Sequence, residues 1–89
     1  MTKQFLYTIY DSVAEIYNQP FYAMNDAVAM RIITDVVNDP ETNLYKNPLD
    51  YILYGIGEYD PYTGVVESYS PHKNLGITQK WVVGAPQDE

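Results

Sequence analysis

The sequence contains no cysteine and only one histidine, His72. Without cysteine the chain can form neither a disulfide nor a thiolate metal site. A lone histidine cannot anchor a zinc site unless several carboxylates join it, and a catalytic triad within one subunit would depend on His72 alone. Gly55-Ile56-Gly57 lacks the spacing of a phosphate-binding loop. We therefore expect a binding protein and not an enzyme, with no cofactor and no metal.

Positive charge is also scarce. Five Lys and Arg residues face twelve Asp and Glu residues, which gives a net charge of −7. In the central stretch 11–67, only Arg31 and Lys46 oppose the carboxylates. A body this acidic repels phosphates at long range, which argues against non-specific duplex binding driven by counterion release.

Long apolar runs are missing as well. No stretch approaches the roughly 18–20 apolar residues of a membrane-spanning helix, and the first residues lack the apolar run of a signal peptide. We expect a soluble, intracellular protein with no membrane partner. A chain of 89 residues forms one domain with a small core. Oligomerisation is the remaining usual source of stability, and a homodimer is its simplest form.

The clearest predicted element is a helix over residues 26–38. Asn25 is a favourable N-cap, and Asp26 places negative charge at the positive end of the helix dipole. Apolar residues repeat at helical spacing and form one stripe, at positions 29, 32, 33, 36 and 37. Pro40 ends the helix, because the residue before a proline disfavours the α conformation. A polar loop over 39–47 follows, with Leu44 and Tyr45 as its candidate anchors.

Period-two alternation, rich in aromatic and β-branched residues, predicts the strands. They cover residues 3–10, 15–18 (stopped by Pro20), 51–59 and 65–69. The link 60–64 has the proline and glycine of a hairpin loop built on a type I turn. Gly55 and Gly57 lie two apart on one face of their strand, which indicates a bulge or the close approach of another backbone or a flat ligand.

These elements follow the order ββαββ. Their most economical packing is a small two-layer α+β domain: an antiparallel sheet of about four strands with one helix packed on one face. The predicted core domain covers residues 1–71. Residues 72–89 form a C-terminal arm, whose apolar run around Ile77 and 81–83 is either an extra strand or a dimer contact.

Tyrosine is unusually frequent, at ten residues of 89. Most of these tyrosines fall on predicted strands, where ordinary sheet packing explains them. Two functional interpretations stay open. Aromatic rings on a sheet face can stack unpaired bases, and tyrosine is also enriched at protein–protein interfaces.

Several segments, in order and spacing, resemble a known family. They are FLYTIYD (5–11), EIYNQPF (15–21), NDA with AMR (25–31), NPLDY (47–51) and LYGIGEYD with TG (53–64). Over residues 4–66 the chain resembles the small nonstructural protein of gokushoviruses, single-stranded DNA phages of the Microviridae. The resemblance implies a protein of the bacterial host cytoplasm that is left out of the mature virion.

The resemblance further implies binding of single-stranded DNA during the switch to single-stranded genome synthesis. The alternative is an acidic adaptor that contacts the phage replication initiator or a host replication factor without binding DNA. For DNA binding, the candidate residues are the five cations and one tyrosine of the third predicted strand: Lys3, Arg31, Lys46, Tyr54, Lys73 and Lys80. Scattered cations suffice only if the fold or a dimer gathers them into one groove.

Overall fold

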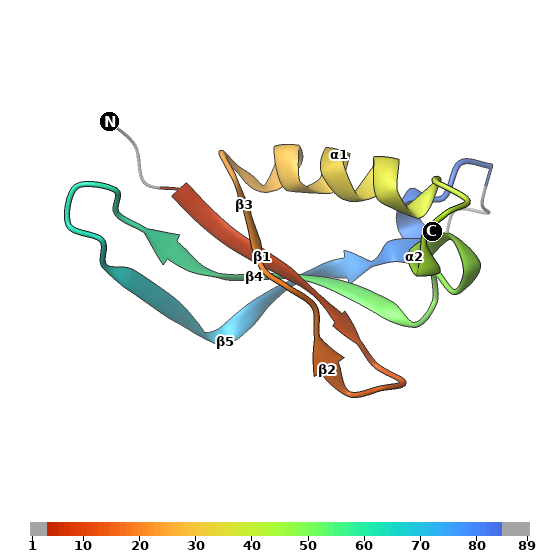
Figure 1. The fold of residues 1–89 in the computed structure, drawn as a ribbon, viewed down its shortest axis with the longest axis horizontal. Helices are drawn as coiled ribbons and strands as arrows, with labels where there is room; N and C mark the ends of the chain where they lie inside the picture. The colour runs from red at the N-terminus through yellow and green to blue at the C-terminus, as the bar shows by residue number, and fades with distance from the viewer. Residues whose placement is uncertain (1–3, 85–89) are drawn as a thin grey trace.

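The computed structural model describes residues 4–84 and has two layers, a twisted antiparallel sheet and a helix lying across one of its faces (Figure 1). The strand order is β2-β1-β4-β5, and β3 also pairs with β1. The strands are β1 (Gln4–Asp11), β2 (Ile16–Tyr17), β3 (Phe21–Ala23), β4 (Tyr51–Tyr59) and β5 (Val66–Ile77). The predicted α+β fold class is therefore confirmed, with five strands where about four were expected.

The main helix, α1 (Asp26–Val37), forms as its sequence predicts. The side chain of Asn25 accepts a hydrogen bond from the Val28 amide at 2.9 Å and caps the helix. The apolar stripe faces the sheet, where Ala29, Ile33 and Val37 are buried. Ile32, at the margin of the stripe, is 39% exposed.

The core lies between α1 and one face of the two central strands. Tyr7 and Ile9 of β1 and Leu53 of β4 point toward the helix and are almost fully buried. Because side chains alternate along a strand, Tyr10 and Tyr54 point to the opposite face. Within residues 4–84 no helix covers that opposite face (Figure 1), and we call it the open face.

The second predicted strand is broken into two. β2 pairs with the end of β1 and β3 with its beginning, so both lie on the same side of β1. Pro20 has no amide hydrogen and lies in the gap between them. There the Thr8 hydroxyl donates a hydrogen bond to the Asn18 carbonyl at 2.7 Å. The sequence prediction placed residues 15–18 well but missed β3.

The segment between α1 and β4 contains a short helix, α2 (Asn43–Lys46), capped by the hydroxyl of Thr42. The prediction of a plain loop over 39–47 was therefore wrong, because a single capped turn gives no periodic signal. Leu44 is buried and anchors the segment, as expected. Tyr45 is 49% exposed and does not.

The fourth predicted strand is much longer than expected. β5 continues past Pro71 to Ile77, across the predicted boundary between core and arm. The apolar run after it is not a fifth strand, since Thr78–Trp81 forms a 3-10 helix (η1) that packs against α1. Asn38 donates to the Trp81 carbonyl at 3.0 Å and accepts from the Val83 amide at 2.9 Å. The described part of the arm thus belongs to the core.

The two glycines of β4 have different surroundings. A Cβ on Gly57 would lie 2.5 Å from the Glu67 carbonyl oxygen, so this residue allows β4 and β5 to approach closely. A Cβ on Gly55 would make ordinary contacts, 3.6 Å from Lys73 Cβ and 3.7 Å from the Tyr7 ring. The pairing of β4 with both neighbours shifts register between the two glycines. The predicted bulge is present.

Candidate functional site

Four aromatic rings form a cluster on the open face. Tyr10 of β1, Tyr17 of β2, Tyr54 of β4 and His72 of β5 bring rings from four strands together. Ring centroids lie 4.7 Å apart for Tyr10 and Tyr17, and 6.2 Å apart for Tyr17 and Tyr54. The rings are tilted or edge-on to one another, as aromatic pairs prefer. We call these four residues the aromatic cluster.

The aromatic cluster is accessible to solvent. Tyr17 is 48% exposed, His72 is exposed, and Tyr10 and Tyr54 are half-buried. The His72 centroid lies 5.8 Å from that of Tyr17 and 6.2 Å from that of Tyr54. Partial burial, followed by the nearby Glu15 carboxylate, raises the pKa of Tyr10, so its ring stays neutral at physiological pH. The cluster therefore presents three tyrosine rings bordered by one histidine.

His72 falls at the start of the predicted C-terminal arm, yet it lies in β5 and touches two tyrosines. Side chains alternate along a strand, so a strand that continued past Pro71 places His72 and Lys73 on opposite faces. Lys73 points to the helix side, and this alternation was the available sequence signal. The signal was hidden because Pro71 suggested that the strand had ended. Tyr10 and Tyr17 were not singled out either, although they form a direct cross-strand pair.

The four predicted cations within residues 4–84 do not gather around the aromatic cluster. Arg31 is exposed on α1, on the side of the sheet opposite to Tyr54. Lys46 is exposed at the end of α2. Lys80 lies over the Trp81 ring at 5.4 Å. Lys3 lies outside the described residues.

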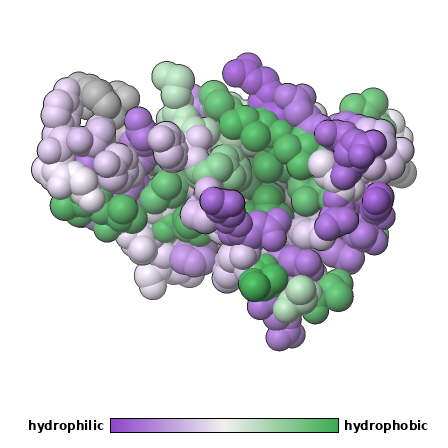
Figure 2. All heavy atoms as spheres, in the orientation of Figure 1, coloured by the Kyte–Doolittle hydropathy of each residue, from purple (hydrophilic) through white to green (hydrophobic). Residues whose placement is uncertain are grey.

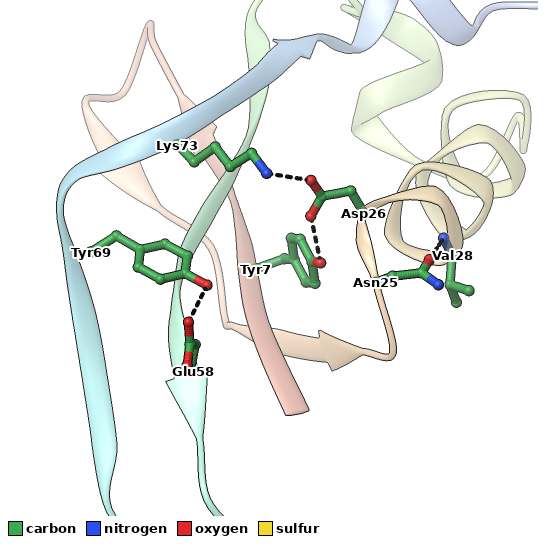
Figure 3. Close-up of polar contacts among 7 residues, drawn as sticks. All are labelled: Tyr7, Asn25, Asp26, Val28, Glu58, Tyr69 and Lys73. Carbon is green, nitrogen blue, oxygen red and sulfur yellow. Dashed lines mark hydrogen bonds and ion pairs between the residues drawn. The ribbon is translucent and has the colours of Figure 1, made fainter. Parts of the chain in front are cut away.

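Lys73 takes part in a second polar arrangement, on the helix side of the sheet (Figure 3). Its ammonium donates to one carboxylate oxygen of Asp26 at 2.6 Å, and the Tyr7 hydroxyl donates to the other at 2.8 Å. Nearby, the Tyr69 hydroxyl donates to Glu58 at 3.1 Å. Strands β1, β4 and β5 and the start of α1 thus meet in one polar network.

This network fixes protonation states. The hydrogen bond from Lys73 lowers the pKa of Asp26, an effect that burial opposes and the Tyr7 hydroxyl reinforces. Burial and the bond to Asp26 raise the pKa of Tyr7. Burial and the bond to Glu58 raise the pKa of Tyr69. At neutral pH the network therefore contains an ionised carboxylate beside two neutral phenols.

The apolar surface is divided among several places (Figure 2). Val65 and Val66 are more than half exposed at the β4–β5 hairpin, as are Val13 and Ile16 at the β1–β2 turn.

Residues 4–84 contain no group of three metal-ligating side chains. No helix in this part of the chain is both long and apolar enough to cross a membrane.

The family model described as "Phage ORF5 protein" matches residues 4–79, which include the aromatic cluster and the Asp26 network. The chain belongs to this family. It is therefore a phage protein, which agrees with part of the expectation from sequence; the narrower assignment to gokushoviruses stays a prediction. No curated protein and no solved structure gives a match.

Proposed function

We propose that this phage protein binds single-stranded DNA, with the aromatic cluster as its stacking surface. The observation that carries the proposal is the meeting of Tyr10, Tyr17, Tyr54 and His72 on the open face. Unpaired bases stack on such rings at about 1–3 kcal/mol per base, without sequence readout. A duplex hides its base faces, so the cluster favours single strands.

The net charge of −7 limits how such a protein can hold DNA. With few cations near the cluster, most of the affinity has to come from stacking and only a little from counterion release. We therefore expect a weaker salt dependence than that of a basic coating protein. We also propose that two copies form a homodimer, which brings two aromatic clusters to one strand and raises affinity by avidity.

Fluorescence anisotropy with a labelled oligothymidine at ~50 and ~200 mM salt tests this function. We expect binding at both salt concentrations, with a modest loss at the higher one, and no comparable binding to a duplex of the same length. Tyr17→Ala and Tyr54→Ala should each weaken binding about 5- to 100-fold, the equivalent of one lost stacking contact. Absence of binding at both salt concentrations would refute the function.

Arg31→Ala serves as the matched control, because Arg31 lies on the opposite side of the sheet from the cluster. In a monomer its removal should change affinity little. An effect as large as that of Tyr54→Ala would indicate that a dimer brings α1 of one copy to the open face of the other. Light scattering of the free protein measures the oligomeric state directly, and a stable monomer would exclude the dimer part of the proposal.

A second function is favoured by the β4–β5 hairpin. A shallow cavity there is lined by Glu58, Asp60, Thr63, Val65 and Glu67, and Tyr62 at the tip is 75% exposed. Carboxylates beside exposed apolar side chains suit a basic protein partner. The phage replication initiator or a host replication factor is the candidate for this adaptor function. Calorimetric titration with the purified initiator tests it, and loss of heat release in Tyr62→Ala would place the contact at the hairpin.

A further inference from the structure

A cavity of about 410 Å³ opens on the helix side of the sheet, away from the aromatic cluster. Pockets of this size hold small molecules in other proteins. Phe5, Leu6 and Ala27 supply apolar wall, and Tyr7 and Tyr69 add aromatic wall. Asp26 and Lys73 supply the charged groups. Figure 3 shows their side chains approaching one another from β5 and the start of α1.

The shape of the cavity depends on Gly55, which lies between Tyr7 and Lys73. A Cβ at this position would touch both neighbours without a clash, at 3.6 and 3.7 Å. Packing alone therefore accepts an alanine at position 55, and the glycine leaves room beside the Tyr7 ring. A flat ligand can use that room, because a planar ring lies close to a surface that has no side chain.

The polar groups of the cavity define the chemistry of the ligand. Asp26 is ionised and accepts hydrogen bonds, and each carboxylate oxygen has a further lone pair beyond those used by Tyr7 and Lys73. The Lys73 ammonium is a donor 2.6 Å from that carboxylate, and its side chain is 57% exposed. A matching ligand offers adjacent donors to Asp26 and an acceptor to Lys73.

Among the DNA bases, guanine meets this description best. Its Watson–Crick edge has two adjacent N–H donors, at N1 and N2, followed by the O6 acceptor. Thymine and cytosine have only one donor group on that edge between or beside acceptors, and adenine has one donor group beside one acceptor. An ionised carboxylate therefore gains two charge-assisted hydrogen bonds from guanine and one from the others.

The position of β5 makes both sites reachable by one strand of DNA. β5 is at the edge of the sheet, and its pairing with β4 is irregular between Ser68 and Lys73. This irregular segment contributes His72 to the aromatic cluster and Tyr69 to the cavity wall. A strand that stacks on the open face can pass around this edge.

The geometry points to a base-specific subsite: the cavity between Asp26, Lys73 and Tyr7 accepts one unstacked guanine of the bound single-stranded DNA. This inference rests on the proposed function. It adds sequence preference to a surface that otherwise stacks any base. The phosphates stay outside the cavity, so the Asp26 charge does not have to face them.

The test compares oligothymidines of about ten nucleotides that carry one central guanine, one inosine or no substitution. Inosine lacks the N2 amino group and so removes one donor. We expect the guanine oligonucleotide to bind wild-type protein about tenfold more tightly than oligothymidine, and inosine to lose most of that preference. Equal affinity for guanine and thymine oligonucleotides would overturn the subsite while leaving the proposed function intact. Failure of every oligonucleotide to bind would overturn both.

Variants separate the cavity from the open face. Asp26→Asn and Gly55→Ala should each reduce the guanine preference, the first by removing the ionised acceptor and the second by filling the space beside Tyr7. Asp35→Asn is the matched control, since it removes a carboxylate from the exposed side of α1 and should keep the preference. Tyr17→Ala should weaken all three oligonucleotides alike. A guanine preference that survives in both cavity variants would overturn the subsite.

Discussion

The two faces of the sheet use the same residue type in different ways. On the face under α1, Tyr7 and Tyr51 are 1% and 8% exposed and belong to the core. On the open face, Tyr17 is 48% exposed and makes ring contacts with two other tyrosines. The strand alternation assigns each tyrosine to its face. The difference shows that tyrosine both fills the core and forms an exposed aromatic surface.

The largest expected effect comes from comparing two residues that lie on opposite faces of the sheet, Leu53 of β4 and Tyr17 of β2. Leu53→Ala should lower the free energy of unfolding by about 2–5 kcal/mol, because Leu53 is fully buried and its truncation leaves a cavity. Tyr17→Ala on the open face should cost about 1 kcal/mol, roughly the value of an aromatic pair. Urea denaturation measures both. Equal losses would contradict the assignment of the faces.

The two glycines of β4 give the next largest contrast. Gly57→Ala should destabilise the protein by about 1–3 kcal/mol, because its Cβ would meet the Glu67 backbone and force the strands apart. Gly55→Ala should change stability by less than about 1 kcal/mol, since its Cβ makes only ordinary contacts. Thermal unfolding of the pair checks this order. The reverse order would show that β4 and β5 are not as close as described.

The stability that the Tyr7 hydroxyl contributes should be lost at alkaline pH. Tyr7→Phe should cost about 1 kcal/mol at pH 7 through the lost bond to Asp26. The raised pKa of Tyr7 means that, above about pH 10, the unfolded chain ionises this phenol while the folded chain keeps its proton. Wild-type stability therefore falls as pH rises through this range. The fall should be shallower in Tyr7→Phe, as measured by denaturation between neutral and alkaline pH.

The smallest expected effect concerns the Lys73–Asp26 ion pair, which is partly exposed. Lys73→Met should cost less than about 1 kcal/mol at pH 7. Because the pair lowers the pKa of Asp26, its contribution is present above the carboxyl's unfolded value near pH 4 and is lost as pH falls through the folded value. The free energies of unfolding of wild type and Lys73→Met should therefore converge as the pH falls into the acid range. A constant difference would show that Lys73 acts through packing.

Much of the fold follows from local sequence. Asn25 and the apolar stripe of α1 specify the helix, and alternation specifies β1 and β4. The broken strand opposite β1 could not be predicted, because β3 has only three residues and depends on pairing with β1 for its existence. β5 was cut short in the prediction because Pro71 normally ends a strand, whereas here it lies where the register shifts.

The candidate sites were less predictable than the fold. Tyr54 was singled out and lies in the aromatic cluster, but its partners come from strands whose register only the folded chain defines. The cavity joins residues 5–7, 25–27, 55, 69 and 73, a combination that no spacing in the sequence reveals. The basic candidates that the structure describes lie apart from the aromatic cluster, because charge alone does not specify where a side chain lies.

In the proposed function the open face, and not the helix side, stacks unpaired bases. Amide and aromatic NMR signals recorded during titration with oligothymidine test it most directly. We expect the largest chemical-shift changes to fall on Tyr10, Tyr17, Tyr54 and His72, with little change along the exposed side of α1. Changes confined to α1, or no change at saturating oligonucleotide, would contradict it.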